Sequence, residues 1–252
     1  AVSVREMMIT DQEAINAETS ATEVARRFER NDWISAPVVD SAGKLLGRIT
    51  IDDVVDVIRE EADHSLTSLA GLAEEDTFAP VWQSAPRRAI WLGINLITAL
   101  LASSVINVFQ DTIEKVVALA VLMPIVASMG GIAGTQSLTI LIRAMAMGQI
   151  NGRNQLWLVG RESLVGLLNG LLWAGVIAIT ASLWFGDATL GVIIACAMLI
   201  NLATAGFAGA GLPLLLRRLQ IDPALAGGVL VTTVTDVMGF LAFLGLAALF
   251  YG

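Results

Sequence analysis

Five apolar stretches dominate this sequence, and each is long enough to cross a lipid bilayer. A hydrocarbon core of roughly 30 Å takes about 20 apolar residues in helical form. Because lipid offers the backbone no hydrogen-bond partners, stretches of this kind must be helices or strands of a closed barrel. A mean hydropathy of +0.73 agrees with a membrane protein. The predicted spanning helices are 89–109, 116–142, 164–185, 190–216 and 224–251.

Charge divides the chain into two modules. Residues 1–85 carry 17 acidic and 7 basic side chains, whereas residues 86–252 carry 6 acidic and 8 basic ones. Strong acidity argues against nucleic acid as a partner and favours the attraction of cations. We therefore predict a soluble module at 1–62, a connecting helix at 63–86 and an all-α membrane module of five helices at 87–252, with lipid as a partner.

The basic residues between the predicted spans give an orientation. They gather on alternate connections, at Arg87, Arg88, Arg143, Arg153, Arg161, Arg217 and Arg218. The positive-inside rule places such connections on the cytosolic side. The expectation is a multi-pass protein of the inner (plasma) membrane, with a cytosolic N-terminal module and an external C-terminus.

One acidic residue, Asp236, lies inside the last apolar stretch. A carboxylate at membrane depth is costly unless it meets a cation, a partner or water, so it is a candidate site for ion or proton passage. Thr232, Thr233 and Thr235 surround it with hydroxyl groups. At the start of the same stretch, Asp222 is expected to cap the helix.

The second span holds a proline and several glycines. Gly130 and Gly134 form a GxxxG pair, which lets two helices approach closely. Alternatively, Pro124 and the glycines loosen the backbone, so that carbonyl oxygens face an aqueous cavity and bind hard cations. Asn201, in the fourth span, is expected to form a hydrogen bond between helices.

The soluble module reads as a small α/β unit. Ser20 and Glu23 form a capping box that opens a helix. Strands are predicted at 34–39 and 45–49, and a helix from Thr50 to about residue 61. This unit resembles a CBS (cystathionine-β-synthase) domain, for which the segment 47–53 is typical. The resemblance implies that Thr50 and Asp53 meet an adenosine ribose, although Thr-x-x-Asp is also an ordinary helix-capping pair.

An acidic cluster follows the second strand. Its members fall within 12 residues, at Asp52, Asp53, Asp56, Glu60, Glu61 and Asp63. Like charges this close repel unless a counter-ion lies among them. The cluster is either a solvated face or a sensor of a divalent cation, since Mg²⁺ is often held by one or two carboxylates and retained water.

The order of the parts resembles the MgtE family of magnesium channels, in its second CBS domain and membrane domain. The second span is similar to the family signature in Met-Pro-Ile-Val-Ala-Ser-Met-Gly-Gly at 123–131, followed by Arg143. The fifth span is similar to it in Asp-Pro-Ala-Leu at 222–225 and Val-Thr-Thr-Val-Thr-Asp-Val at 231–237.

This resemblance implies a homodimeric Mg²⁺-selective channel that takes up magnesium and closes when cytosolic Mg²⁺ is plentiful. The implied pore residues are Asp236, Thr232, Gly130 and Gly131. The implied regulatory metal ligands are Asp32, Asp53, Asp56 and Glu61. ATP or another adenine nucleotide is the further ligand expected at the CBS domain.

Three departures from the family pattern bear on these expectations. Ile132 stands where the family usually has Asn, which removes an amide from the pore side. His64 and Ser65 stand where some relatives have acids. The acidic helical domain and the first CBS domain of the family do not occur in this sequence, so the chain is expected to be either a piece of a longer protein or a naturally short, less tightly gated channel.

Two other classes of protein compete with a channel. An ion-coupled carrier would use Asp236 as a H⁺ or Na⁺ site in exchange for a divalent ion. A membrane-anchored CBS sensor would use its spans only as an anchor. An enzyme is not expected, because no base, nucleophile and oxyanion donors occur together. Selectivity over Co²⁺, Ni²⁺ and Mn²⁺ does not follow from these residues.

Overall fold

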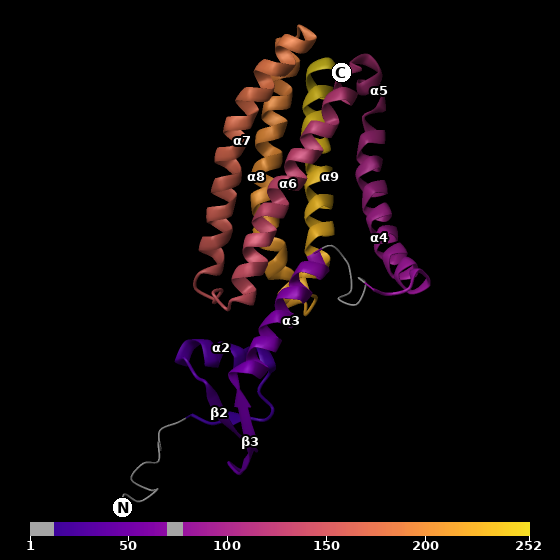
Figure 1. Ribbon diagram of the computed structural model, residues 1–252. Helices are drawn as coiled ribbons and strands as arrows, with labels where there is room; N and C mark the ends of the chain where they lie inside the picture. Colours follow the sequence, from indigo (N-terminus) through magenta and orange to yellow (C-terminus); the bar gives the residue numbers. More distant parts are fainter. Residues whose placement is uncertain (1–12, 70–77) are drawn as a thin grey trace, which may run out of the picture. The chain divides into compact units, whose positions relative to one another are not determined.

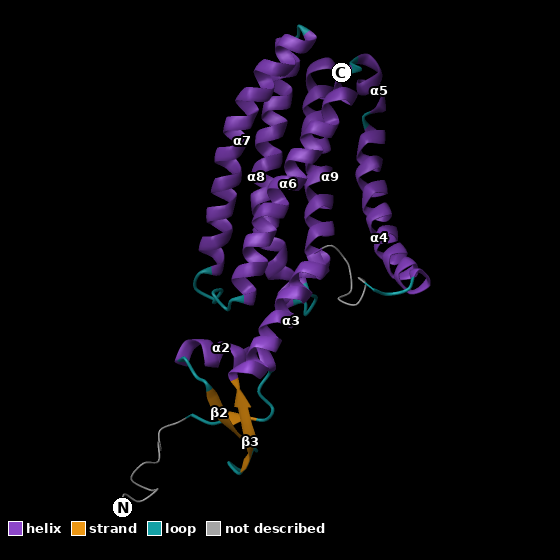
Figure 2. Cartoon of the chain, viewed as in Figure 1, coloured by secondary structure: helices purple, strands orange, loops and turns teal. Residues whose placement is uncertain are grey.

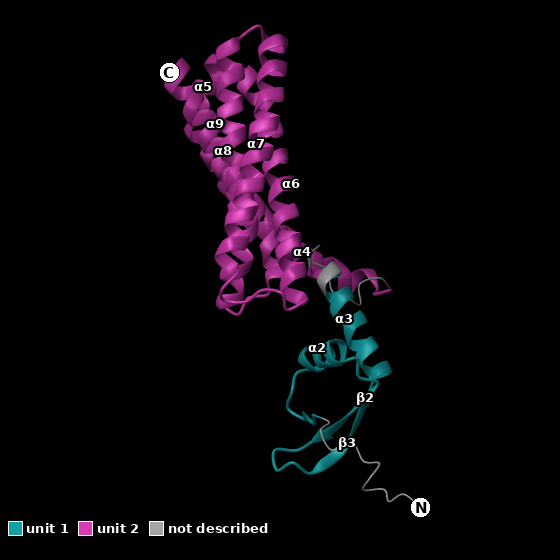
Figure 3. Ribbon diagram, turned by 90° about the vertical axis from the view of Figure 1, so that its left-hand side faces the viewer, with its two compact units in different colours: residues 1–67 teal, residues 68–252 magenta. Residues whose placement is uncertain are grey.

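The computed structural model describes residues 13–69 and 78–252. The chain separates into two compact units, residues 1–67 and 68–252, which are coloured separately in Figure 3. The first is a small α/β unit and the second is helical, so the predicted fold class is confirmed.

A three-stranded sheet organises the first unit (Figure 2). The central strand β2 (Ser35–Val39) pairs in parallel with the short β1 (Ile15–Asn16) and antiparallel with β3 (Leu45–Thr50). The two predicted strands are confirmed, whereas the two-residue β1 was not predicted. The core is formed by buried apolar residues of the sheet and of helices α2 (Ala21–Asn31) and α3 (Ile51–Leu69): Ile15, Val24, Ala25, Phe28, Ala36 and Val54.

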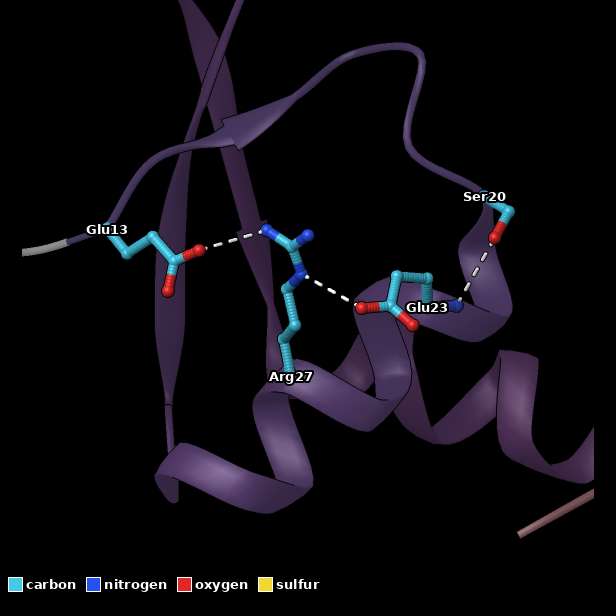
Figure 4. Close-up of polar contacts among 4 residues, drawn as sticks. All are labelled: Glu13, Ser20, Glu23 and Arg27. Carbon is cyan, nitrogen blue, oxygen red and sulfur yellow. Dashed lines mark hydrogen bonds and ion pairs between the residues drawn. The ribbon is translucent and has the colours of Figure 1, made fainter. Parts of the chain in front are cut away.

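Helix α2 (Ala21–Asn31) begins where the capping box predicts. Ser20 Oγ accepts the Glu23 backbone N–H at 3.4 Å. One helical turn on, Arg27 forms ion pairs with Glu23 at 3.2 Å and with Glu13 at 3.1 Å (Figure 4). The second pair ties the helix to the segment that leads into β1. The following helix, α3 (Ile51–Leu69), continues past its predicted end at residue 61.

The second unit contains five long apolar helices, as predicted. They are α4 (Val81–Val108), α6 (Ala118–Ala146), α7 (Gln155–Phe185), α8 (Ala188–Arg218) and α9 (Pro223–Tyr251). The short helix α5 (Gln110–Lys115) joins the first two and was not predicted. Each long helix extends past its predicted apolar stretch at one end or both. The end of α4 and the start of α6, on either side of α5, instead fall one or two residues short of the prediction.

Helix α8 is the centre of this unit. It packs against α6, α7 and α9, while α4 packs on α9 at the edge of the bundle (Figure 1). Small residues permit these close crossings. A Cβ atom at Gly166 of α7 or at Gly206 of α8 would collide with a backbone carbonyl of the facing helix. The bundle therefore depends on backbone-to-backbone approach, as expected for helices that pack in lipid.

The GxxxG pair of α6 serves helix packing. Added Cβ atoms would meet the Asn201 amide of α8 at Gly130 and the Val231 side chain of α9 at Gly134. Helix α6 runs without a break through Pro124. The alternative prediction, a backbone loosened into free carbonyls, is therefore wrong for the described chain, because continuous helical hydrogen bonding engages most of those carbonyls.

Candidate functional site: an acidic groove between α6 and α9

A groove of about 950 Å³ runs between α6 and α9. Its walls combine one carboxylate with hydroxyl, amide and small apolar groups. The lining residues are Ala127, Ser128, Gly131, Ile132, Thr135, Gln136, Thr139, Ile140, Thr232 and Asp236. A site of this composition offers oxygen ligands and a single negative charge.

Helix α9 contributes the carboxylate. It begins as predicted, with Asp222 Oδ1 accepting the Ala224 N–H at 2.9 Å and Pro223 in the first turn. Fourteen residues later, close to four helical turns, Asp236 lies half-buried at the groove. Within residues 13–69 and 78–252, Asp236 has no hydrogen-bond or ion-pair partner. Its two oxygens are therefore available to a cation or to water.

Three of the hydroxyl groups at the groove donate their protons to their own helices. Thr232 Oγ1 lies 3.0 Å from the Gly228 carbonyl. On α6, Thr135 Oγ1 donates to the Gly131 carbonyl at 2.8 Å and Thr139 Oγ1 to the Thr135 carbonyl at 2.8 Å. With the proton directed backwards, the lone pairs of each hydroxyl oxygen are free to accept. The groove wall thus presents several acceptor oxygens beside Asp236.

Such a surface suits a divalent cation that keeps its water. Mg²⁺ dehydrates reluctantly and is usually held by one or two carboxylates and several waters. A water molecule takes about 30 Å³ in the liquid, so a groove of about 950 Å³ has room for an ion with its first shell. Asp236 supplies attraction, and the hydroxyl oxygens can accept hydrogen bonds from the bound water.

The structure brings together three of the four predicted pore residues. Asp236, Thr232 and Gly131 line the groove, and a Cβ atom on Gly131 would lie 3.7 Å from Thr232 Cγ2. Gly130 does not line it. Successive helical residues differ by about 100° in direction, and Gly130 faces Asn201 of α8 instead.

Sequence reasoning missed much of the α6 wall. Ser128, Thr135, Gln136 and Thr139 line the groove but were not predicted as site residues. A signal was present, because Gly131, Thr135 and Thr139 recur every four residues and so share one helix face. Small and hydroxyl residues at this spacing, inside an apolar span, indicate a helix face that does not contact lipid.

The predicted regulatory acids lie in the first unit and are exposed. Asp32 ends α2 with a left-handed backbone at φ 50°, while Asp53, Asp56 and Glu61 lie on α3. Across the described ranges, no three acidic, cysteine or histidine side chains converge as a metal site. One chain alone therefore does not bring these four carboxylates together on an ion.

Thr50 and Asp53 form the capping pair at the start of α3. The backbone N–H and the side-chain hydroxyl of Thr50 each donate to Asp53 Oδ2 at 3.1 Å. The capping prediction is confirmed for these residues.

A second carboxylate in the membrane unit, Glu162, was not predicted at all. It lies on α7 with 2% of its surface exposed. Ser137 of α6 donates to Glu162 Oε2 at 2.9 Å, and Arg161 pairs with Oε1 at 2.6 Å. Both oxygens of this carboxylate are engaged, so it joins α6 to α7.

Sequence comparisons match both units of the chain. Residues 4–60 match the CBS domain, and residues 123–246 match the MgtE family, described as divalent cation transporter. A magnesium transporter MgtE of Bacillus subtilis is 35% identical over 98% of this chain and 55% of its own length. That of Thermus thermophilus is 34% identical over 98% of this chain and 55% of its own length.

A third such transporter, from Enterococcus faecalis, is 30% identical over 99% of this chain and 58% of its own length. The chain thus spans little more than half the length of these relatives. The similarity runs through both units, and the groove residues Gly131 and Asp236 lie within the matched family region. Residues 123–246 of the membrane unit thus match the MgtE family of divalent cation transporters, and both units are similar to its members.

Proposed function

We propose that the chain forms a dimeric, Mg²⁺-selective channel that takes up magnesium. The observation that carries this proposal is the unpaired carboxylate of Asp236 in a groove of acceptor oxygens. A buried charge without a partner costs free energy, which a bound cation would offset. The names of the three relatives support magnesium as that cation.

A second copy of the chain would complete the site. In one chain the groove is open on one side, and Ile132 on its wall is 57% exposed. A dimer with the two grooves facing each other encloses a path and presents two Asp236 carboxylates to one divalent ion. Two negative charges balance Mg²⁺, whereas one does not.

The proposed direction of transport follows the basic connections. Arg143 and Arg153 flank the α6–α7 connection, and Arg217 and Arg218 end α8. The positive-inside rule makes these ends cytosolic, in the inner (plasma) membrane. The CBS unit and the regulatory sites are then also cytosolic, where they are exposed to the magnesium that has entered.

The proposed gate uses the acidic surface of the CBS unit. Asp53 and Asp56 are exposed on α3 and require further carboxylates to hold an ion. Mg²⁺ bridging Asp32, Asp53, Asp56 and Glu61 to acids of another unit or copy would hold a closed arrangement, and loss of Mg²⁺ would release it by repulsion. Thr50 and Asp53 are the proposed contacts of an adenine nucleotide.

Two rival functions make different predictions for the same groove. A carrier would couple Mg²⁺ to protons or Na⁺ at Asp236, and its flux would need a gradient of that ion. An anchored sensor would carry no flux.

Mg²⁺ uptake into proteoliposomes distinguishes these functions. The protein is reconstituted without a H⁺ or Na⁺ gradient, at low and high internal Mg²⁺, with Asp236→Asn as the matched isosteric control. The channel predicts uptake by the parent at low internal Mg²⁺ and its loss in Asp236→Asn. Uptake that requires a H⁺ or Na⁺ gradient supports the carrier, and equal flux in parent and variant contradicts the assignment of Asp236.

A further inference from the structure

Asn201 of α8 lies fully buried where α6, α8 and α9 cross. Its exposed fraction is 0%, and its Nδ2 donates to the Val126 carbonyl of α6 at 2.8 Å. In an α-helix that carbonyl also accepts from the N–H of residue 130. The predicted helix-to-helix hydrogen bond is therefore confirmed, and it reaches α6 close to the groove wall.

Two glycines make room for the Asn201 amide from opposite helices. A Cβ atom at Gly130 of α6 would lie 2.8 Å from Asn201 Cγ, and one at Gly239 of α9 would lie 2.7 Å from Nδ2. Real Cβ atoms do not approach this closely, so neither glycine can be replaced without a shift of the amide or the helices. The amide thus fixes the distance between α6 and α9.

The hydrogen bonding of Asn201 indicates why an amide is used. Its Oδ1 is buried and has no hydrogen-bond partner within the described residues. An unpaired buried acceptor costs free energy, which an apolar side chain of similar size would avoid. Space filling alone therefore does not explain this residue, whereas the directed bond to Val126 does.

The amide lies directly behind the groove. Gly130 is adjacent to Gly131, which lines the groove, and Gly239 follows Asp236 by three residues, about one helical turn. We infer that Asn201 is a positioning residue for the ion path, which sets the separation of the α6 wall from the Asp236 wall. The effect of Asn201 on ions rests on the proposed function. Its effect on the distance between α6 and α9, the geometric part of the inference, does not.

A cysteine pair across the groove tests the geometric part without any transport. In a Cys196→Ala background, Gly131→Cys and Thr232→Cys place one thiol on each wall, since the Cβ of the first would lie 3.7 Å from the Cγ2 position of the second. Disulfide formation within one chain is followed by loss of free thiol in the full membrane protein. Its rate reports the α6–α9 separation, because the geometry of the bond is narrow.

Asn201→Ala is expected to slow this cross-link at least about threefold, because it removes the hydrogen bond to the Val126 carbonyl. Adding Gly130→Ala should not restore the rate, because a methyl group refills the vacated space but cannot donate that bond. Gly239→Ala, which keeps the amide but displaces it, should also slow the reaction. An unchanged rate in Asn201→Ala, or full recovery in the double variant, overturns a positioning role of the hydrogen bond. Rates are taken per folded protein, so that misfolding is not counted as slowing.

Flux measurements without the cysteine pair test the effect on ions. Asn201→Ala is expected to lose Mg²⁺ over Ca²⁺ discrimination by about tenfold, because a wider site accepts the larger and more flexible Ca²⁺ shell. If Asn201→Ala discriminates Mg²⁺ from Ca²⁺ as well as the parent does, measured per folded protein, the result contradicts a role of Asn201 in the ion path. A parent without flux refutes the proposed function instead, and the cross-link still decides the position of the helices.

Discussion

Two carboxylates of the membrane unit, Glu162 and Asp236, show opposite solutions to the same problem. Glu162 is 2% exposed, and its two oxygens are engaged by Ser137 and Arg161. Asp236 is half-buried, faces the groove between α6 and α9, and has no partner in the parts of the chain that are described. One acid is satisfied within the protein, and the other is open to a ligand.

Unused acceptor capacity, rather than depth alone, marks a carboxylate as a candidate ion site. A buried carboxylate must be compensated. Where the protein supplies the compensation, as at Glu162, the group contributes to packing. Where it does not, as at Asp236, water or the proposed cation supplies it. The two residues are therefore expected to respond differently to substitution, Asp236 in flux and Glu162 in stability.

The largest expected effect is the loss of flux on Asp236→Asn. At about 6 Å and an effective dielectric constant near 20, one unit-charge interaction amounts to roughly 3 kcal/mol, or about 100-fold. We expect Mg²⁺ flux to fall by at least that factor. The thermal midpoint in detergent should stay the same or rise, because the desolvated charge is removed. A variant that unfolds instead would mean that Asp236 is a packing residue.

The next effect concerns the stability of the pair around Glu162. Arg161→Ala leaves the buried Glu162 carboxylate with Ser137 as its partner. It should lower the free energy of unfolding by about 2 kcal/mol. This is less than for a fully buried ion pair, because Arg161 is half-exposed and solvent screens the interaction. Glu162→Gln retains an acceptor for Ser137 and should cost about 1 kcal/mol or less. Unfolding in denaturant measures both, and the opposite order would contradict the assignment.

A smaller change is expected at Ile132, which is 57% exposed on the groove wall. Ile132→Asn adds an amide where the family pattern has one, and should raise Mg²⁺ flux a few-fold by offering a further acceptor to the hydrated ion. The matched control is Ile132→Leu, which keeps the wall apolar and should leave the flux as it is. Equal flux in all three proteins would exclude Ile132 from the path.

The smallest effect lies at the other end of the bundle. Asp187 caps α8 and accepts a hydrogen bond from Tyr251 of α9, which lowers the pKa of Asp187 below its ordinary value of 3.8. The resulting stability is present above about pH 3.8 and is lost as the pH falls through the lower folded-state pKa.

Tyr251→Phe should therefore reduce the free energy of unfolding at neutral pH by about 1 kcal/mol. The difference from the parent should shrink as the pH falls below 3.8 and Asp187 is protonated. Thermal melting over this pH range measures it. A difference that does not change with pH would show that Tyr251 acts by packing alone.

Much of the fold follows from local pattern. The five apolar stretches predict α4 and α6 to α9 because length and hydropathy are properties of each stretch alone. The capping boxes at Ser20 and Thr50 correctly start α2 and α3. Strand β1 was missed because two residues have no periodicity, and its existence depends on β2 beside it.

The site could be predicted only in part, for a physical reason. Asp236 and Thr232 could be chosen from the sequence because each is a polar residue in an apolar stretch, which is recognisable without knowledge of its neighbours in the fold. Which of two adjacent glycines faces the groove depends on helix rotation, which the partners α8 and α9 set, so the sequence could not show that Gly131 lines the groove and that Gly130 faces Asn201. Glu162 lies beyond the start of α7 but before its apolar stretch, and thus gave no signal.

One paired measurement tests the central claim most directly: Mg²⁺ flux per folded protein and free energy of unfolding, determined together for Asp236→Asn and Glu162→Gln. The account predicts that Asp236→Asn loses flux and keeps stability, whereas Glu162→Gln loses some stability and keeps flux. Loss of flux in Glu162→Gln with parental flux in Asp236→Asn would contradict it, and would move the ion path away from the groove between α6 and α9.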